Sequence, residues 1–214
     1  MTQSSQLSER ARGRPVETDQ QDLKRQILDT AEELFADNGY AATSIRSIAE
    51  KSGVNPALVH YYFGNKKRLL QNVLERVLEP MGLAIAELKS GAVASPETIS
   101  RLLISMAAKH PNIPRLLIRE VLLPGGELQQ FFAENMAPRL GGALPGLLER
   151  EKSAGRLRGD SDPAISAMLI MAVSIFPFIA RTLAEPVLGI SYDEEGIEFL
   201  TAQITQLLDR GITQ

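Results

Sequence analysis

The segment Val54–Leu70, with the sequence VNPALVHYYFGNKKRLL, decides how the rest of the chain is interpreted. It contains two of the four tyrosines and one of the two histidines of the 214-residue chain, and it includes the basic run Lys66–Arg68. The chain has no Trp and no Cys, so aromatic and basic residues are concentrated here. Because the net charge of the whole chain is −3, such a cluster requires a local explanation.

Local signals divide this segment into two helices. Asn55 is a good helix cap, and Pro56 is a good first helical residue because the N–H that proline lacks has no helical partner at that position. Gly64 interrupts the pattern, and Lys66 opens a second helical run. We therefore predict a short helix over residues 56–62 and a longer helix from Lys66 to about Glu79.

The preceding residues predict two further helices and a tight turn. Apolar residues at helical spacing form one stripe between Thr18 and Gly39, where glycine in the left-handed conformation ends the helix. A second helix begins at Thr43 or Ser44, either of which is a good cap, and Gly53 occupies the turn that follows. The expected core positions of these two helices are Leu23, Ile27, Ala31, Leu34, Phe35, Ile45, Ile48 and Ala49.

Two helices joined by a short turn that contains glycine form a helix-turn-helix. Here the first helix covers residues 43–52, the turn residues 53–55, and the second helix residues 56–62. In this geometry the second helix enters the major groove of DNA and the first crosses the backbone. The sequence therefore predicts a DNA-binding unit in the first third of the chain.

Residues 23–70 resemble the DNA-binding domain of the TetR/AcrR family of bacterial transcription regulators. The resemblance is carried by the stretch ILDTAEELFADNGYAATSIRSIAEKSGVNPALVHYYFGNKKRLL. An apolar helix ends in Phe-x-x-x-Gly, a Thr opens the second helix, and the run IAEKSGV is followed by Tyr-Tyr-Phe-x-x-Lys-x-x-Leu-Leu. The remaining two thirds are similar to the family only in size and in helical pattern.

The resemblance implies contacts with the DNA backbone. It implies that Thr43 and Tyr61 bond phosphates through their hydroxyl groups, and that Arg46 contacts a phosphate or a base. Lys66, at the start of the following helix, is implied to contact a phosphate with the help of the positive helix N-terminus. Its neighbours Lys67 and Arg68 are expected on a solvated helix face.

The resemblance also places Pro56, Ala57 and His60 on the base-facing side of the recognition helix. For His60 the alternative is that it makes no contact with DNA. The family often has Gly at the position of Ala57 and a polar residue at that of Pro56. Pro56 and Ala57 offer only apolar contacts, for example to a thymine methyl group. The caps Ser44 and Asn55 complete the predicted DNA-binding set.

The charge distribution agrees with a nucleic-acid reader. Residues 40–70 carry five basic side chains and one acidic side chain, whereas residues 71–214 carry 13 basic and 17 acidic ones. A basic patch on an acidic body favours DNA binding, with a solvated helix face as the alternative. Residues 1–17 predict a flexible basic arm, in which Arg12 and Arg14 belong to the Arg-Gly-Arg-Pro core of an AT-hook for the minor groove. A plain disordered tail is the alternative.

The rest of the chain favours helices throughout. We therefore predict an all-α fold with a DNA-binding domain over residues 18–66 and a larger helical domain over residues 67–214 for effector binding and dimerisation. Residues 113–123 predict a helix buried all round, and residues 127–152 a helix kinked by Gly141, Gly142 and Pro145. The apolar helix over 162–183 and the narrow-striped helix over 194–210 are the candidates for a homodimer seam, with intramolecular core as the alternative.

The helices between these regions are expected to hold an effector pocket. By the resemblance, the effector is a small and partly apolar molecule, and ordinary core packing is the alternative for each of its candidate liners. The polar groups that could fix the effector are His110, Arg119 and Arg181. The apolar candidates are Met106, Phe131, Phe132, Met136, Met168, Met171 and Phe176.

Other functions are disfavoured by what the sequence lacks. Without cysteine there is no disulfide, no Cys-ligated zinc and no thiol nucleophile, and two distant histidines argue against a metal site. We find no nucleophile–base set and no phosphate loop, so no enzyme activity and no cofactor are expected. The first residues have no apolar core of a signal peptide, and the longest apolar run, over 164–180, is interrupted by polar residues and proline. A cytoplasmic protein with no membrane contact is expected.

These observations predict a dimeric, ligand-responsive repressor. It would bind a palindromic operator in double-stranded DNA through its helix-turn-helix and be released by a small-molecule effector. The alternative is a DNA-binding activator or dual regulator without a small-molecule ligand.

Overall fold

The computed structural model describes residues 17–213, with side chains from residue 20 onward. The predicted arm residues Arg12 and Arg14 therefore lie outside the described residues. Within the described range every regular element is a helix, and the only pairing of extended backbone is an isolated bridge between Leu157 and Thr213. The predicted all-α class is confirmed.

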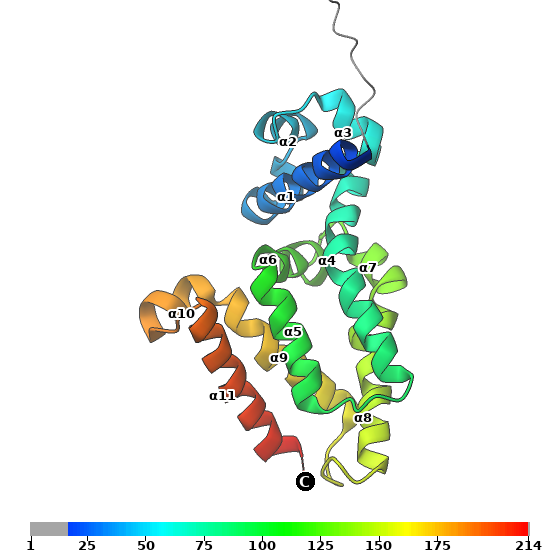
Figure 1. Cartoon of the computed structure of the whole chain (residues 1–214), viewed down its shortest axis with the longest axis vertical. Coiled ribbons are helices and arrows are strands. Elements are labelled where there is room, and N and C mark those ends of the chain that lie inside the picture. Colours follow the sequence, from blue (N-terminus) through cyan, green and yellow to red (C-terminus); the bar gives the residue numbers. More distant parts are fainter. Residues whose placement is uncertain (1–16, 214) are drawn as a thin grey trace, which may run out of the picture.

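The helices form a small unit at one end and a larger body at the other, joined by one long helix (Figure 1). We call α1–α3 the helix-turn-helix unit and α5–α11 the helical body, and α4 runs from the first into the second. The α-helices are α1 Glu17–Ala42, α2 Ile45–Lys51, α3 Pro56–Phe63, α4 Lys66–Lys89, α5 Pro96–Lys109, α6 Asn112–Leu117, α7 Gln129–Asn135, α8 Leu144–Ser153, α9 Pro163–Ile179, α10 Arg181–Leu188 and α11 Glu194–Ile212. A π-helix, η1 Ile118–Leu122, follows α6, and the short 3-10 turns η2 Ala137–Arg139 and η3 Gly141–Ala143 precede α8.

The helix-turn-helix unit has the core that the sequence predicts. Ile27, Ala31 and Phe35 of α1 are fully buried, as are Ile48 and Ala49 of α2. Gly39 interrupts α1 with a φ of 81°, a conformation that side chains with a Cβ rarely adopt. These residues pack on the first half of α4, whose Leu69, Leu70, Val73 and Leu74 are also fully buried.

Four element predictions need correction. The predicted kinked helix over residues 127–152 is broken into α7, η2, η3 and α8, and Pro145 lies in the first turn of α8 instead of kinking a helix. α4 continues to Lys89 instead of ending at Glu79, because the buried stripe of Leu78, Met81 and Ile85 continues past Pro80, which lies inside the helix on an exposed position. The predicted helix over 113–123 changes into the π-helix η1, and Leu122 is 70% exposed rather than buried. The predicted helix over 162–183 ends at Ile179.

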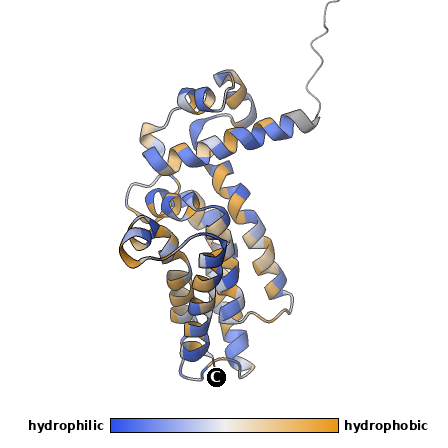
Figure 2. Cartoon of the chain, turned by 60° about the vertical axis from the view of Figure 1, so that its left-hand side comes forward, coloured by the Kyte–Doolittle hydropathy of each residue, from blue (hydrophilic) through white to orange (hydrophobic). Residues whose placement is uncertain are grey.

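The helical body is built around α5, which packs against both α9 and α11. Most helices carry alternating bands of hydrophilic and hydrophobic residues (Figure 2), as amphipathic helices require. Among the residues that the structure describes, no single helix is long and apolar enough to cross a membrane. Only α9 and α10 taken together reach such a length and composition, and they are bent by 73° at their junction.

Candidate nucleic-acid interface and cavity

The turn between α2 and α3 is fixed by hydrogen bonds on both sides. Gly53 adopts a φ of 65°, and the amide of Val54 donates to the carbonyl of Ala49 at 2.9 Å. The side chain of Gln26 in α1 donates to the carbonyl of Ser52 at 3.1 Å. The first helix of the unit therefore holds the turn from behind, so that α2 and α3 keep one relative orientation.

α3 presents one face to the core and the other to solvent. Val59 is fully buried and Phe63 is 6% exposed, so these two side chains anchor the helix. Pro56, Ala57 and His60 are exposed, as the sequence predicts for a base-facing surface. The Nδ1 atom of His60 lies 2.7 Å from the carbonyl oxygen of Gly64, so this side chain closes the end of α3.

Tyr61 is the most exposed large apolar side chain of the described residues, at 80%. Its ring meets that of Tyr62 edge to face, with centroids 5.2 Å apart, and Tyr62 is half-buried against the core. Lys24 of α1 places its Nζ 5.0 Å from the centroid of the Tyr62 ring. Sequence analysis did not single out Lys24, because only the packing of α1 against α3 brings its charge beside the two tyrosines.

Thr43 does not have the role that the family resemblance implied. Thr43 is only 2% exposed. Its hydroxyl donates to two carbonyl oxygens of α1, that of Gly39 at 2.8 Å and that of Leu34 at 3.0 Å. A buried hydroxyl with these partners closes the corner between α1 and α2 and does not reach a phosphate. The cap of α2 is Ser44, which forms a capping box with Ser47.

Lys66 also differs from its prediction. Its Nζ donates to the carbonyls of Tyr40 at 2.8 Å and Thr43 at 2.9 Å, and it lies 4.2 Å from the centroid of the Tyr40 ring. Lys66 therefore ties the start of α4 to the corner between α1 and α2 instead of pointing freely outward. Burial raises the pKa of the Tyr40 hydroxyl, and the nearby Glu127 carboxylate raises that pKa further.

The predicted basic patch is smaller than the count of charges indicates. Lys51 forms an ion pair with Glu33, and Lys67 forms one with Glu127 at 2.9 Å. Arg46 and Arg68 are exposed, and no ion pair joins either side chain to another residue of the described chain. Asn55 caps α3 by accepting the Ala57 amide at 2.8 Å, and remains exposed at the base-facing end.

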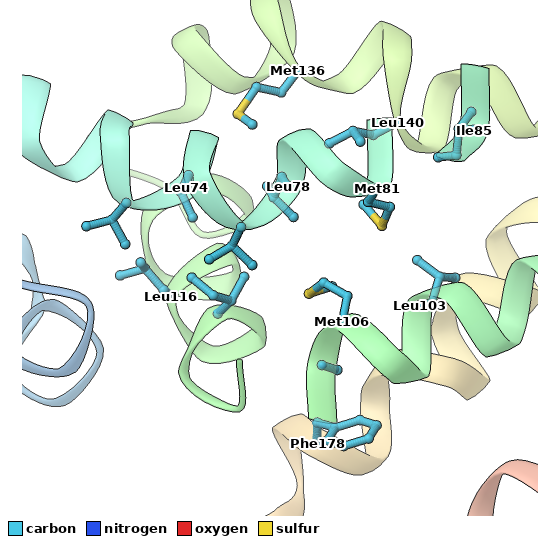
Figure 3. Close-up of a cluster of buried hydrophobic side chains, with 14 of the residues drawn as sticks. Leu74, Leu78, Met81, Ile85, Leu103, Met106, Leu116, Met136, Leu140 and Phe178 are labelled. Atoms are coloured by element: carbon cyan, nitrogen blue, oxygen red, sulfur yellow. The ribbon is translucent and has the colours of Figure 1, made fainter. Parts of the chain in front are cut away.

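A cavity of about 610 Å³ lies between α4, α5, η1 and α9. Met81 of α4 and Met106 of α5 point toward each other across the space between these helices (Figure 3). Of the predicted liners, the structure places five in the wall of this cavity. They are Met106, Phe132, Met168, Met171 and Phe176.

Five predicted pocket residues lie elsewhere. His110 has its Nδ1 3.6 Å from the Glu32 carboxylate, and Arg119 donates weakly to the carbonyls of Ala36 at 3.4 Å and Asp37 at 3.5 Å. Both polar side chains therefore face α1 instead of the cavity. Met136 lies on the other side of α4 from Met106 (Figure 3), and Phe131 packs against the core without lining the wall. Arg181 lies over the ring of Tyr192 at 4.9 Å.

Sequence analysis missed most of the cavity wall. Aliphatic residues from several helices between α4 and α9 line it together with the five predicted residues. Nothing in their helical spacing distinguishes them from ordinary core, because the wall and the core share the same apolar stripes. Among the missed residues are Leu78, Leu102, Ile118, Leu122, Ile175 and Ile179.

The π-helix η1 joins the cavity to the helix-turn-helix unit. Ile118, Val121 and Leu122 line the cavity. On the other side of the same helix, the buried carboxylate of Glu120 accepts the Tyr40 amide at 3.0 Å and the Glu127 amide at 3.3 Å. Tyr40 in turn is bonded by Lys66, so hydrogen bonds run without a break from η1 to the start of α4.

Comparisons with known proteins agree with this geometry. Residues 27–73 match the family model described as bacterial regulatory proteins, tetR family. The HTH-type transcriptional repressor Rv3405c of Mycobacterium tuberculosis is 37% identical over 134 residues, which is 62% of this chain. The match spans 64% of that relative, less than two thirds of its length.

Solved structures share the fold over most of the chain. The transcriptional regulator FadR from Bacillus subtilis, in complex with stearoyl-CoA, has a TM-score of 0.67 and 21% identity. The match covers 86% of this chain and 96% of that one. The SmeT–triclosan complex has a TM-score of 0.67 and 17% identity, over 90% of this chain and 92% of that one. At these identities the likeness is one of fold alone.

The chain contains a helix-turn-helix. A fixed turn joins α2 to the short α3, which is anchored in the core on one side and exposed on the other. Residues 27–73 match the model of the tetR family of bacterial regulatory proteins, the repressor Rv3405c is similar over part of its length, and the solved structures share the fold, so the N-terminal part of the chain is similar to the DNA-binding domain of that family.

Proposed function

We propose that the chain is a dimeric transcriptional repressor that binds a palindromic operator through α3 and leaves it when a small effector enters the cavity. Residues 18–66 bind DNA, and residues 67–214 hold the effector and the second copy. The observation that carries the proposal is the face of α3. Its base-facing residues are exposed while the opposite side is anchored in the core, which is how a recognition helix meets the major groove. The repressor Rv3405c supports the direction of regulation.

The phosphate contacts come from residues around this face. Tyr61 directs an exposed hydroxyl outward, and Arg46 and Arg68 supply exposed cations. Lys66 and Thr43 contribute indirectly, because they hold the corner from which α2 and α3 project. Contacts with phosphates position such a unit, while the residues on the exposed face of α3 meet base edges.

Dimerisation is supported by apolar side chains left in solvent on α9 and α11. On α9, Ile165 is 53% exposed and Leu169 is 46% exposed, and on α11 Phe199 is 69% exposed and Leu207 is 61% exposed. Exposed apolar side chains gathered on two helices are typical of a surface that binds another protein. A two-fold dimer places two copies of α3 in successive major grooves, about one helical turn or roughly 34–36 Å apart.

Release by the effector is supported by η1. A ligand that displaces Ile118 or Leu122 moves the same short helix that carries Glu120. The carboxylate of Glu120 holds the amide of Tyr40, and with it the corner between α1 and α2. A ligand that favours the displaced position of η1 therefore favours a different placement of α3, and operator affinity falls by the ratio of its affinities for the two states.

A gel-shift titration against the promoter region beside its own gene tests the proposal. We expect saturable binding whose logarithmic affinity falls linearly with the logarithm of salt concentration, because phosphate contacts release counterions. A melting-temperature screen of small molecules tests the effector, since a ligand that binds the folded state raises the midpoint. Absence of salt-sensitive binding to any such fragment would contradict DNA recognition by this chain.

A further inference from the structure

The side chains that line the cavity are all hydrocarbon or thioether groups. Of the residues that the structure describes around it, none carries a charged side chain or one that forms strong hydrogen bonds. The polar candidates His110 and Arg119, which the sequence placed there, are engaged with α1 instead. A ligand group that needs hydrogen bonds is strongly disfavoured in such a space, because it leaves its partners in water and finds no side chain to replace them. The part of a ligand inside the cavity is therefore hydrocarbon.

The wall changes from buried to exposed across the cavity. Leu78, Ile99 and Leu144 are each 1% exposed and close the inner side. At the outer side, Leu122 is 70% exposed and Phe176 is 63% exposed, although both also line the cavity. A ligand in this space has one end enclosed by apolar side chains and the other end at a mouth beside η1 and α9.

The wall also adapts in shape. Met81, Met106, Met168 and Met171 all border the cavity, and unbranched thioether side chains fill irregular gaps in several rotamers. Such a wall accommodates a flexible chain of variable length better than it selects one rigid ring system. The wall distinguishes ligands by the apolar surface that they bury in it, and this surface increases with every methylene group of the ligand.

We propose that the effector class is the unbranched alkyl chain, with its hydrocarbon end enclosed against α4 and α5 and any polar end at the mouth between η1 and α9. The inference rests on the proposed function, since it names the ligand of the same site. The polar end adds little to affinity, because no side chain of the wall is available to recognise it.

Calorimetric titration of the full-length chain without DNA tests this class. The probes are 1-octanol, 1-decanol and 1-dodecanol, each below its solubility limit. We expect the dissociation constant to fall about four-fold for each added methylene group, with a negative heat-capacity change. Replacing 1-dodecanol by dodecanoate should alter the dissociation constant by less than one methylene does. A dissociation constant that does not change with chain length overturns the proposal. So does binding of dodecanoate without binding of 1-dodecanol.

Two matched substitutions on α9 locate the site. Ala172 lines the cavity and is exposed, whereas Ala164 lies two turns earlier on the same helix, is also exposed and does not line the cavity. Ala172→Phe should weaken 1-dodecanol binding at least tenfold by filling the mouth, while Ala164→Phe should leave it unchanged. Equal losses in both variants place binding elsewhere and overturn the proposal. The chain-length series on the unmodified protein decides the question even if a variant does not fold.

A gel-shift experiment separates this inference from the proposed function. If the alcohols bind with the expected chain-length dependence but saturating 1-dodecanol leaves operator binding intact, the ligand class stands and effector-driven release is wrong. If instead the alcohols do not bind, and an ionised compound without an alkyl chain releases the operator from the unmodified protein but not from the Ala172→Phe variant, release stands and the ligand class is overturned.

Discussion

Around the corner between α1 and α2, polar groups are fixed by specific hydrogen bonds, whereas no side chain that lines the described cavity forms one. Lys66 and Glu120 hold Tyr40 from its carbonyl and its amide, so the corner has one geometry. The cavity is bordered by methionine, phenylalanine and aliphatic residues. The difference agrees with the proposed function, in which one region binds DNA through fixed donors at fixed spacing and the other binds a variable apolar ligand with a wall that rearranges.

The largest effect is expected in the core of the helix-turn-helix unit. Phe35 is fully buried, and its ring stacks on that of Tyr40 with centroids 6.1 Å apart. Phe35→Ala should lower the free energy of unfolding by about 3–5 kcal/mol, because a well-packed site collapses little around the missing ring. Urea unfolding at one fixed protein concentration measures the change. A loss below about 1 kcal/mol would mean that this unit is packed as loosely as the cavity wall.

A smaller effect is expected at the corner itself. Lys66→Ala removes two hydrogen bonds from an ammonium group to carbonyls, and bonds to charged groups contribute about 1.5–3 kcal/mol. Since Lys66 is only half-buried, we expect a loss near the lower end, about 2 kcal/mol, together with weaker operator binding.

The neighbouring lysine is the control for that substitution. Lys67 makes an ion pair with Glu127 in which the two side chains are 49% and 33% exposed, and such surface pairs contribute about 0–1 kcal/mol. Lys67→Ala should therefore leave the urea midpoint almost unchanged. Equal destabilisation by both substitutions would show that the bonds of Lys66 to Tyr40 and Thr43 are unimportant.

Substitution in the cavity wall should cost less than the corresponding change in a packed core. Met106 borders the open space, so its side chain lacks neighbours on one side and has fewer contacts to lose. Met106→Ala should lower the free energy of unfolding by about 1–2 kcal/mol, below the roughly 2–5 kcal/mol typical of fully packed methionines. Urea unfolding in the absence of added ligand measures this. A larger loss would mean that the wall is packed as tightly as the core.

The sequence predicted the helix-turn-helix well because its signals are local. The cap Asn55, the first residue Pro56 and the turn residue Gly53 act on neighbours within a few positions, and the structure has α3 where they predict it. The buried stripe of α1 follows from helical spacing alone. Base-facing exposure of Ala57 and His60 then follows from the opposite burial of Val59 and Phe63.

The same reasoning failed where a side chain depends on distant partners. Lys66 is fixed by carbonyls 26 and 23 positions away, and Glu120 by an amide 80 positions away. His110 and Arg119 looked like pocket polar groups, but their partners lie on α1, which no spacing within their own segments indicates. Cavity and core also share one apolar pattern, so which methionines face empty space was decided only by how the helices pack.

The smallest effect is expected at Tyr61, where one hydroxyl is changed on an exposed side chain. Tyr61→Phe removes no contact with the core, so the urea midpoint should stay unchanged. Loss of one hydrogen bond to a phosphate should weaken operator binding by about 0.5–1.5 kcal/mol, roughly two- to ten-fold, and by a similar factor for every operator variant because phosphates carry no sequence information. Gel-shift titrations with matched operator variants measure this. A change in the preferred sequence would instead place Tyr61 against the bases. Tyr61 would then join the residues of α3 that read the operator sequence.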